Sequence, residues 1–180
     1  RDYALDPFGK TALEYIKENG MSVAAVGKIE DIYNGKGVTE AVHIKNNMDG
    51  VDKTLEYMDK IDNGLIFTNL VDFDMLYGHR NDPKGYGKAL EDFDGRLNEI
   101  YSKLRDEDIL IITADHGCDP TTESTDHSRE YIPILVYGKK VKGGTELGIR
   151  DSFTDIGKSV LDYLGIDNNL EGKSFINEII

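Results

Sequence analysis

Short apolar runs alternate along the chain with segments in which apolar residues recur at helical spacing. The apolar runs are typical of buried strands and span residues 22–26, 65–71, 108–114 and 132–137. The helical segments span residues 10–19, 49–61, 86–104 and 153–164. Strands that are separated by helices form parallel sheets, because each connection crosses back over a face of the sheet. We therefore predict an α/β fold with a mostly parallel sheet flanked by helices.

The 180 residues are sufficient for one domain with a hydrophobic core and hardly for two. A hydrophobic fraction of 39% and a charged fraction of 31% are typical of a soluble globular protein. No apolar run approaches the ~20 residues of a membrane-spanning helix, so no membrane partner is expected. The single cysteine, Cys118, rules out an intrachain disulfide and favours a cytoplasmic setting. Because the chain starts with Arg1 rather than Met, we expect a piece of a longer protein.

The formal net charge of −13 limits the partners that the chain can bind. Nucleic acid is not expected as a partner, because its phosphates would be repelled and the sequence contains no basic stripe. A small phosphorylated substrate meets the same repulsion unless the site supplies local positive charge. Clustered metal ions would supply such charge in an acidic protein.

Three of the four histidines, His79, His116 and His127, lie in predicted loops beside strands. Each of them has a carboxylate close by in sequence, such as Asp74 for His79 and Asp115 for His116. In an open α/β sheet, ligands bind beyond the carboxyl ends of the strands. Imidazole and carboxylate together suit Mn²⁺, Zn²⁺ or Fe²⁺ better than Ca²⁺. We predict that Asp115 and His116 serve one ion and that Asp74, His79 and His127 serve a second. Paired ions would stabilise the attacking and leaving oxygens of a phosphoryl displacement.

Simpler interpretations remain open for each of these residues. An Asp-His pair after a strand is often a turn with a satisfied histidine, and aspartates in such loops often cap backbone amides. Lys28 follows Gly27 at the end of an apolar run, where it is either a phosphate contact or a solvated lysine. His43 has no carboxylate partner in the pattern, and we expect it to be structural or exposed.

Several segments together make the chain recognisable: residues 26–29, 47–50, 69–80 (NLVDFDMLYGHR), 113–117 (TADHG) and 125–133 (TDHSREYIP). The sequence resembles the phosphopentomutases, metal-dependent members of the alkaline phosphatase superfamily, along nearly its whole length. The resemblance implies an alkaline-phosphatase-like core. It also implies interconversion of ribose 1-phosphate and ribose 5-phosphate, and of the deoxyribose counterparts.

The family's properties suggest a role for each site residue. Two Mn²⁺ ions are expected, one held by Asp74, His79 and His127 and the other by Asp115 and His116. Lys28 is similar to a lysine that contacts substrate phosphate. The family passes a phosphoryl group through an enzyme threonine, which a sugar bisphosphate activator of the glucose 1,6-bisphosphate type can charge.

The chain lacks several segments that are part of the family pattern. The phosphorylated threonine and a further metal-binding aspartate belong to an N-terminal segment that has no match here, and the cap domain is also absent. Residues 1–180 thus resemble the C-terminal part of the catalytic core, an incomplete core that we expect to be inactive alone. Cys118 stands where relatives commonly have asparagine. Two alternatives remain: a phosphoglycerate mutase or phosphatase of the same superfamily, and a non-catalytic metal-binding module.

Overall fold

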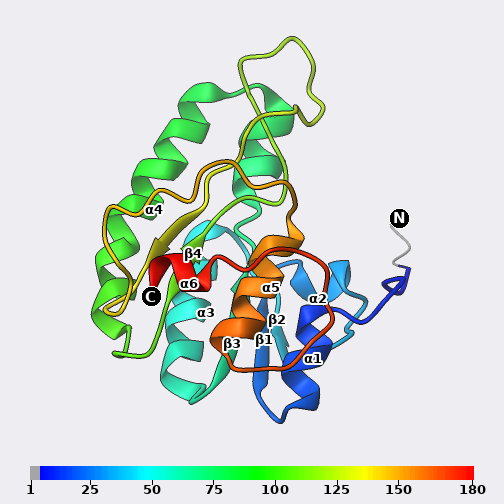
Figure 1. Ribbon diagram of the computed structural model, residues 1–180. Coiled ribbons are helices and arrows are strands. Elements are labelled where there is room, and N and C mark those ends of the chain that lie inside the picture. The colour runs from blue at the N-terminus through cyan, green and yellow to red at the C-terminus, as the bar shows by residue number, and fades with distance from the viewer. Residues whose placement is uncertain (1–4) are drawn as a thin grey trace.

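The computed structural model describes residues 5–180 and is an α/β structure (Figure 1). Residues 1–4 of the predicted domain lie outside the described residues. The strands are β1 (Ser22–Val26), β2 (Glu40–Val42), β3 (Gly64–Thr68), β4 (Leu110–Ile112) and β5 (Leu135–Tyr137). The α-helices are α1 (Ala12–Glu18), α2 (Ile29–Ile32), α3 (Asn47–Lys60), α4 (Pro83–Lys103), α5 (Thr154–Tyr163) and α6 (Ile176–Ile179). A π-helix, η1 (Phe73–Tyr77), and a 3₁₀-helix, η2 (Gly78–Arg80), follow β3.

The main sheet has the strand order β2-β1-β3, and all of its pairings are parallel. Alternate residues of β1 point to opposite faces of the sheet, as in any strand. Val23 and Ala25 pack in a buried cluster with residues of α1 and α5. Ala24 and Val26 pack on the other face with Tyr57 of α3. The predicted α/β fold, with a parallel sheet flanked by helices, is confirmed (Figure 1).

The second sheet differs from the expectation, because β4 and β5 pair with each other in antiparallel register. No helical segment lies between the predicted strands 108–114 and 132–137, so the argument from helical crossovers did not apply to this pair. Pro133 lies in the predicted strand 132–137 and has no N–H to donate, and β5 begins only at Leu135. The sequence pattern also missed β2, which is only three residues long.

Helix starts follow from their caps rather than from apolar periodicity. The Asn46 side chain accepts from the Asp49 amide, so α3 begins at Asn47 rather than at residue 49. The Asp82 side chain accepts from the Gly85 amide with Pro83 in the first turn, and α4 therefore begins before residue 86. Within the described residues, no helix has the length and apolar character needed to cross a bilayer.

Candidate metal centre

The segment after β3 places Asp74 and His79 beyond the carboxyl end of that strand. Asp74 lies in the first turn of η1, and His79 lies in η2 directly after it. The Met75 amide donates to the Val71 carbonyl at 2.9 Å, which starts the turn as soon as the strand has ended. Predicted strand 65–71 therefore ends at Thr68, and the remaining residues form the connection to the helical turns.

The long connection from β4 to β5 contributes His116 and His127, and its yellow-green part extends at the top of the view in Figure 1. Two hydrogen bonds hold its ends together: the Ser128 amide donates to the Gly117 carbonyl at 3.2 Å, and the Asp119 amide donates to Ser128 Oγ at 2.8 Å. Gly117 and Ser128 form an antiparallel bridge. This bridge brings two histidines that are 11 positions apart to one place.

Asp74 Oδ1 is the centre of the cluster. It lies 3.3 Å from His79 Nε2, 3.3 Å from His127 Nε2 and 3.8 Å from His116 Nε2. Asp115 Oδ1 lies 3.7 Å from His116 Nε2, and the Asp115 side chain is 62% exposed whereas that of Asp74 is 29% exposed. All five side chains with predicted ligand roles therefore lie together at one edge of the structure.

The histidine rings are oriented with Nε2 toward Asp74. His79 Nδ1 lies 2.5 Å from the Thr125 carbonyl oxygen, and His116 Nδ1 lies 3.0 Å from the Gly117 carbonyl oxygen. A carbonyl can only accept, so Nδ1 carries the proton and Nε2 of the neutral ring keeps a free lone pair. The His116 and His127 rings stack with centroids 3.8 Å apart. Two backbone carbonyls thus prepare Nε2 atoms for a metal, a role that sequence patterns do not reveal.

The donor set fits a divalent ion. Asp74 Oδ1 is buried and has no hydrogen-bond partner among the described residues. Burying an acceptor without a partner costs free energy of folding, so such an atom needs an explanation. Ligand atoms of Asp74, His116 and His127 lie within 4.8 Å of one another. Two donors about 2.1 Å from one tetrahedral ion would lie about 3.4 Å apart, close to the separations around Asp74 Oδ1. A cation here would satisfy the buried oxygen.

The structure does not separate the two predicted ligand sets. His116, which we assigned with Asp115 to one ion, lies as close to Asp74 as to Asp115, at 3.8 and 3.7 Å. The group whose ligand atoms all lie within 4.8 Å of one another consists of Asp74, His116 and His127, so it crosses the two predicted sets. The division of the ligands between two ions therefore stays a prediction.

Lys28 lies at the same edge of the main sheet but makes no side-chain hydrogen bond or ion pair with any described residue. It follows Gly27, whose φ of +84° is in the left-handed region that favours glycine. A β-carbon at Gly27 would overlap the Asn69 carbonyl oxygen, so the end of β1 lies against the segment leading to Asp74. His43, the remaining histidine, is 71% exposed and lies 3.9 Å from Asp31.

Cys118 lies beside the cluster as a neutral group. Burial raises the pKa of its thiol, and the negative charges of Asp74 and Asp119 raise that pKa further.

We expect Gly117→Ala to weaken Mn²⁺ binding about tenfold, a loss typical of disturbed support for metal ligands. A β-carbon at this position would lie 2.5 Å from the Glu130 amide and would also overlap the Ser128 carbonyl. Relief of this overlap moves the His127 segment away from His116. Close approach of the backbone at Ser128 and Glu130 therefore requires a glycine at this position.

Calorimetric titration of both proteins with Mn²⁺ measures this effect. Gly87→Ala, on α4, is the matched control, because no described residue outside its own stretch of helix lies within 4 Å of a β-carbon built there. The control should bind Mn²⁺ as the wild type does. Equal affinity of Gly117→Ala and wild type would contradict the role of the bridge.

The chain is highly similar to curated phosphopentomutases. It is 75% identical over 175 residues to a phosphopentomutase of Clostridium acetobutylicum, covering 97% of this chain and 45% of that protein. It is 63% identical over 180 residues to one of Acetivibrio thermocellus, covering 100% of this chain and 46% of that protein. The chain spans about half the length of the curated relatives it matches.

A solved structure shares the fold at low sequence identity. The PH0037 protein of Pyrococcus horikoshii superposes with a TM-score of 0.60, covering 87% of this chain and 46% of that chain at 18% identity. At this identity the likeness concerns the fold alone.

A protein-family comparison covers most of the sequence. Residues 2–168 match the family described as the Metalloenzyme superfamily. That match contains Asp74, Asp115 and the three clustered histidines, whose arrangement suits a divalent ion. The chain therefore belongs to the metalloenzyme superfamily.

Proposed function

We propose that the intact protein is a phosphopentomutase that interconverts the 1- and 5-phosphates of ribose and deoxyribose. The observation that carries the proposal is the convergence of three imidazoles on Asp74 Oδ1 in a chain 75% identical to a phosphopentomutase. Such an enzyme needs a site that holds a dianionic phosphate in an acidic protein. The clustered donors provide a place for cations that make this possible.

We propose that the centre holds two divalent ions, with Mn²⁺ as the native metal. Imidazole and carboxylate donors suit Mn²⁺, and bound ions would supply Lewis-acid stabilisation of phosphate oxygens. In this proposal Asp74, His79 and His127 hold one ion, and Asp115 with His116 holds the other. The exposed Asp115 carboxylate leaves the second position open on one side. Further ligands can enter there.

Lys28 is proposed to bind the phosphate of the substrate as a point charge. Its side chain is exposed, and it closely follows the end of β1 at the N-cap of α2. No carboxylate among the described residues forms an ion pair with it, which leaves its ammonium group available to a ligand. It would hold and orient the sugar phosphate while the metal centre acts on the reacting phosphoryl group.

We propose that these residues are the C-terminal part of a larger catalytic core. The chain spans 45% to 46% of the relatives' length. Among the described strands, β3 pairs only with β1 and β4 only with β5, which leaves one edge of each free. The apolar residues of both strands are only partly buried, so a further strand could pair there. The remainder would supply the threonine that stores the phosphoryl group, a further metal-binding aspartate and the cap domain.

A phosphoenzyme mechanism needs an initial phosphoryl donor, and a sugar bisphosphate activator is the proposed source. The activator would transfer a phosphoryl group to the threonine. The phosphothreonine would then give this group to the free hydroxyl of the sugar phosphate, and the threonine would take back the phosphoryl group from the other oxygen of the sugar, which restores the phosphothreonine. We place the enzyme in the cytoplasm and in nucleoside catabolism. A single free cysteine fits a reducing compartment.

The intact protein should convert ribose 1-phosphate to ribose 5-phosphate in the presence of Mn²⁺ and glucose 1,6-bisphosphate. Residues 1–180 alone should not, because metal ions position phosphate but cannot store it between two transfers. The measurement follows ribose 5-phosphate, with 3-phosphoglycerate and a simple phosphate ester as competing substrates.

Three other results would overturn this function, and a fourth would overturn the expected inactivity of residues 1–180. Preference for 3-phosphoglycerate would indicate a phosphoglycerate mutase, and release of inorganic phosphate would indicate a phosphatase. Metal binding without turnover of any substrate by the intact protein would indicate a non-catalytic module. Turnover by residues 1–180 alone would show that the nucleophile lies within this chain.

A further inference from the structure

A reciprocal pair of hydrogen bonds joins the start of α3 to the segment that carries Asp74. The Asn47 amide donates to Asp72 Oδ2 at 2.8 Å, and the Asp72 amide donates to Asn47 Oδ1 at 2.9 Å. Asn47 is 4% exposed and is the first residue of α3. Asp72 stands immediately before η1, two residues from Asp74. The pair therefore connects a buried helix end to the backbone of the cluster's central ligand.

The turn that carries Asp74 has little support of its own. A π-helix is rare and occurs as single turns, so η1 depends on surrounding contacts for its position. Asp72 occupies the N-cap position of η1, but its side chain makes no capping hydrogen bond there. Both its carboxylate and its amide are used in the contact with Asn47 instead. The position of this turn is thus set from outside, by α3 through this pair and by α4 through the contact of the Phe73 ring with the Tyr86 ring.

Helix α3 is a firm support for such a contact. Val51 and Leu55 on this helix are buried and pack with Ile100 of α4. The Asn47 amide is one of the first amides of the helix and has no acceptor within it, and the Asp72 carboxylate provides one. A negative charge at a helix N-terminus is also favourable. Asn46 caps the Asp49 amide separately, so Asp72 does not duplicate the ordinary cap.

The buried Asn47 amide group indicates that this geometry is maintained at a cost. Asn47 Nδ2 has no hydrogen-bond partner among the described residues, although an unpaired buried donor is unfavourable. The side chain nevertheless keeps its Oδ1 on the Asp72 amide. An aliphatic residue would avoid the unpaired donor but would release the backbone before η1.

We propose that the Asn47–Asp72 pair is a positioning device that holds Asp74 Oδ1 where the three histidines reach it. Among the described residues, neither side chain forms a hydrogen bond or ion pair with a clustered side chain, and the pair acts through the backbone between residues 72 and 74. The pair restricts the conformations of Asp74 before the metal binds, so less conformational entropy is lost when binding occurs. This role rests on the metal centre of the proposed function.

Mn²⁺ titration of the intact protein and four variants tests the proposal. Asn47→Ala and Asp72→Ala each remove one side-chain acceptor, and both should weaken Mn²⁺ binding about tenfold, as lost support of metal ligands does. Asp72→Asn keeps an oxygen that accepts from the Asn47 amide, and its affinity should stay within about threefold of wild type. Each protein is titrated by calorimetry at a temperature where circular dichroism shows it to be folded.

Ser159→Ala is the control for general destabilisation. Ser159 is buried on α5, where its hydroxyl donates to the Asp155 carbonyl at 2.7 Å and accepts from the Phe175 amide at 2.9 Å. The Ser159→Ala variant therefore loses comparable hydrogen bonds at a place away from the cluster. It should lower the melting temperature without changing Mn²⁺ affinity. The positioning role is wrong if Asn47→Ala and Asp72→Ala bind as wild type does, or if Ser159→Ala binds as weakly as they do. If the wild type itself failed to bind Mn²⁺, the proposed metal centre would be wrong, rather than the positioning role alone.

Discussion

Replacing Asp74 with alanine should abolish tight Mn²⁺ binding. We expect the affinity to fall by more than about 100-fold, because removing a ligand itself costs more affinity than removing a group that supports a ligand. Asp74 Oδ1 is the atom that all three clustered imidazoles approach, at 3.3, 3.3 and 3.8 Å. Without it, His116 and His127 lose the anionic donor between them. Calorimetric titration of the variant and the wild type measures the difference in affinity.

The same substitution should have the opposite effect on the metal-free protein. Asp74 Oδ1 is buried without a hydrogen-bond partner among the described residues, so its removal relieves a desolvation cost. Metal-free Asp74→Ala should therefore be at least as stable as metal-free wild type. Metal stabilises the wild type by about 2.7 kcal/mol at a concentration 100 times the Kd, and this gain should be absent in the variant. Thermal unfolding with and without Mn²⁺ measures both effects.

Asp126→Ala is a matched control for Asp74→Ala. Asp126 precedes His127 on the same segment, is exposed, and its carboxylate makes no hydrogen bond or ion pair with a described residue. This variant should keep both the affinity and the thermal shift. A thermal shift in Asp74→Ala equal to that of wild type would show that the metal binds elsewhere.

The location of the site followed from the sequence because strand ends carry strong constraints. In a parallel sheet, the segments that leave the strands on the same side meet at one edge, so residues after β3 were expected near those after β1. Asp74 and His79 could be placed on such a segment from the pattern alone. The sequence also showed that an acidic protein needs local positive charge to bind phosphate, which favoured clustered metal ligands.

The finer geometry depends on contacts that sequence spacing does not contain. The bridge between Gly117 and Ser128 brings His127 to the cluster, and it depends on hydrogen bonds across a long connection. The proximity of His116 to Asp74 depends on ring orientation, which a carbonyl oxygen sets. The Asn47–Asp72 pair joins residues 25 positions apart. Spacing predicts local elements, and these contacts form only after the elements have packed.

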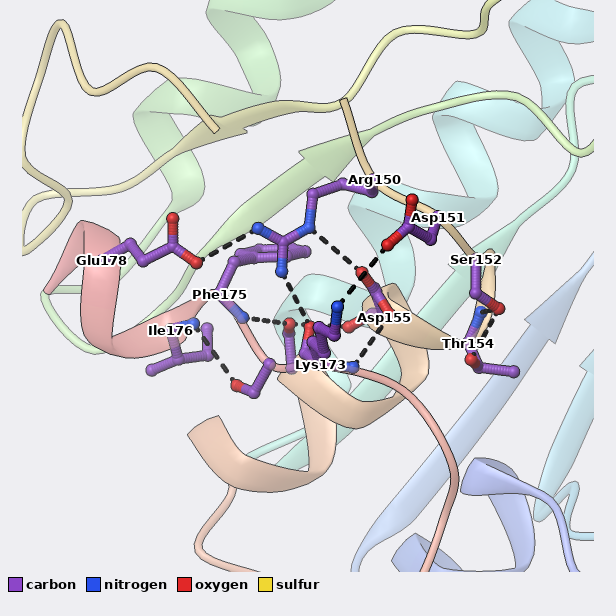
Figure 2. Close-up of polar contacts among 11 residues, drawn as sticks. Arg150, Asp151, Ser152, Thr154, Asp155, Lys173, Phe175, Ile176 and Glu178 are labelled. Atoms are coloured by element: carbon purple, nitrogen blue, oxygen red, sulfur yellow. Dashed lines mark hydrogen bonds and ion pairs between the residues drawn. The ribbon is translucent and has the colours of Figure 1, made fainter. Parts of the chain in front are cut away.

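Replacing Arg150 with methionine should lower the free energy of unfolding by about 3 kcal/mol, the loss expected when one partner of a buried ion pair is removed. Figure 2 shows the guanidinium at the centre of a network that joins α5, α6 and the segment between them. It donates to Asp155 at 3.1 Å, to Glu178 at 3.1 Å and to the Lys173 carbonyl at 3.0 Å. It also lies 5.6 Å from the centre of the Phe175 ring.

The large expected loss of stability follows from the burial of this network. The Arg150 side chain is 14% exposed and that of Asp155 is 5% exposed, so removing the guanidinium leaves a buried carboxylate without its cation. Methionine retains much of the aliphatic length, which limits the loss of packing. Urea unfolding at neutral pH measures the change. Lys173→Ala is the control, because the Lys173 side chain is 79% exposed and its ion pair among the described residues is with the exposed Asp151, while its backbone contacts to the network remain.

The loss should depend on pH, because Asp155 is the buried acid of the network. The Lys173 amide, followed by Arg150, holds the pKa of the Asp155 carboxyl below its ordinary value of 3.8. A group with a lowered folded-state pKa stabilises the protein above its ordinary pKa, and this stabilisation is lost as the pH falls through the lowered value. The difference between wild type and Arg150→Met should therefore be largest near neutral pH and should shrink below pH about 4. A difference that stays constant through the acid range would mean that packing of the guanidinium on Phe175, rather than its charge, provides the stabilisation.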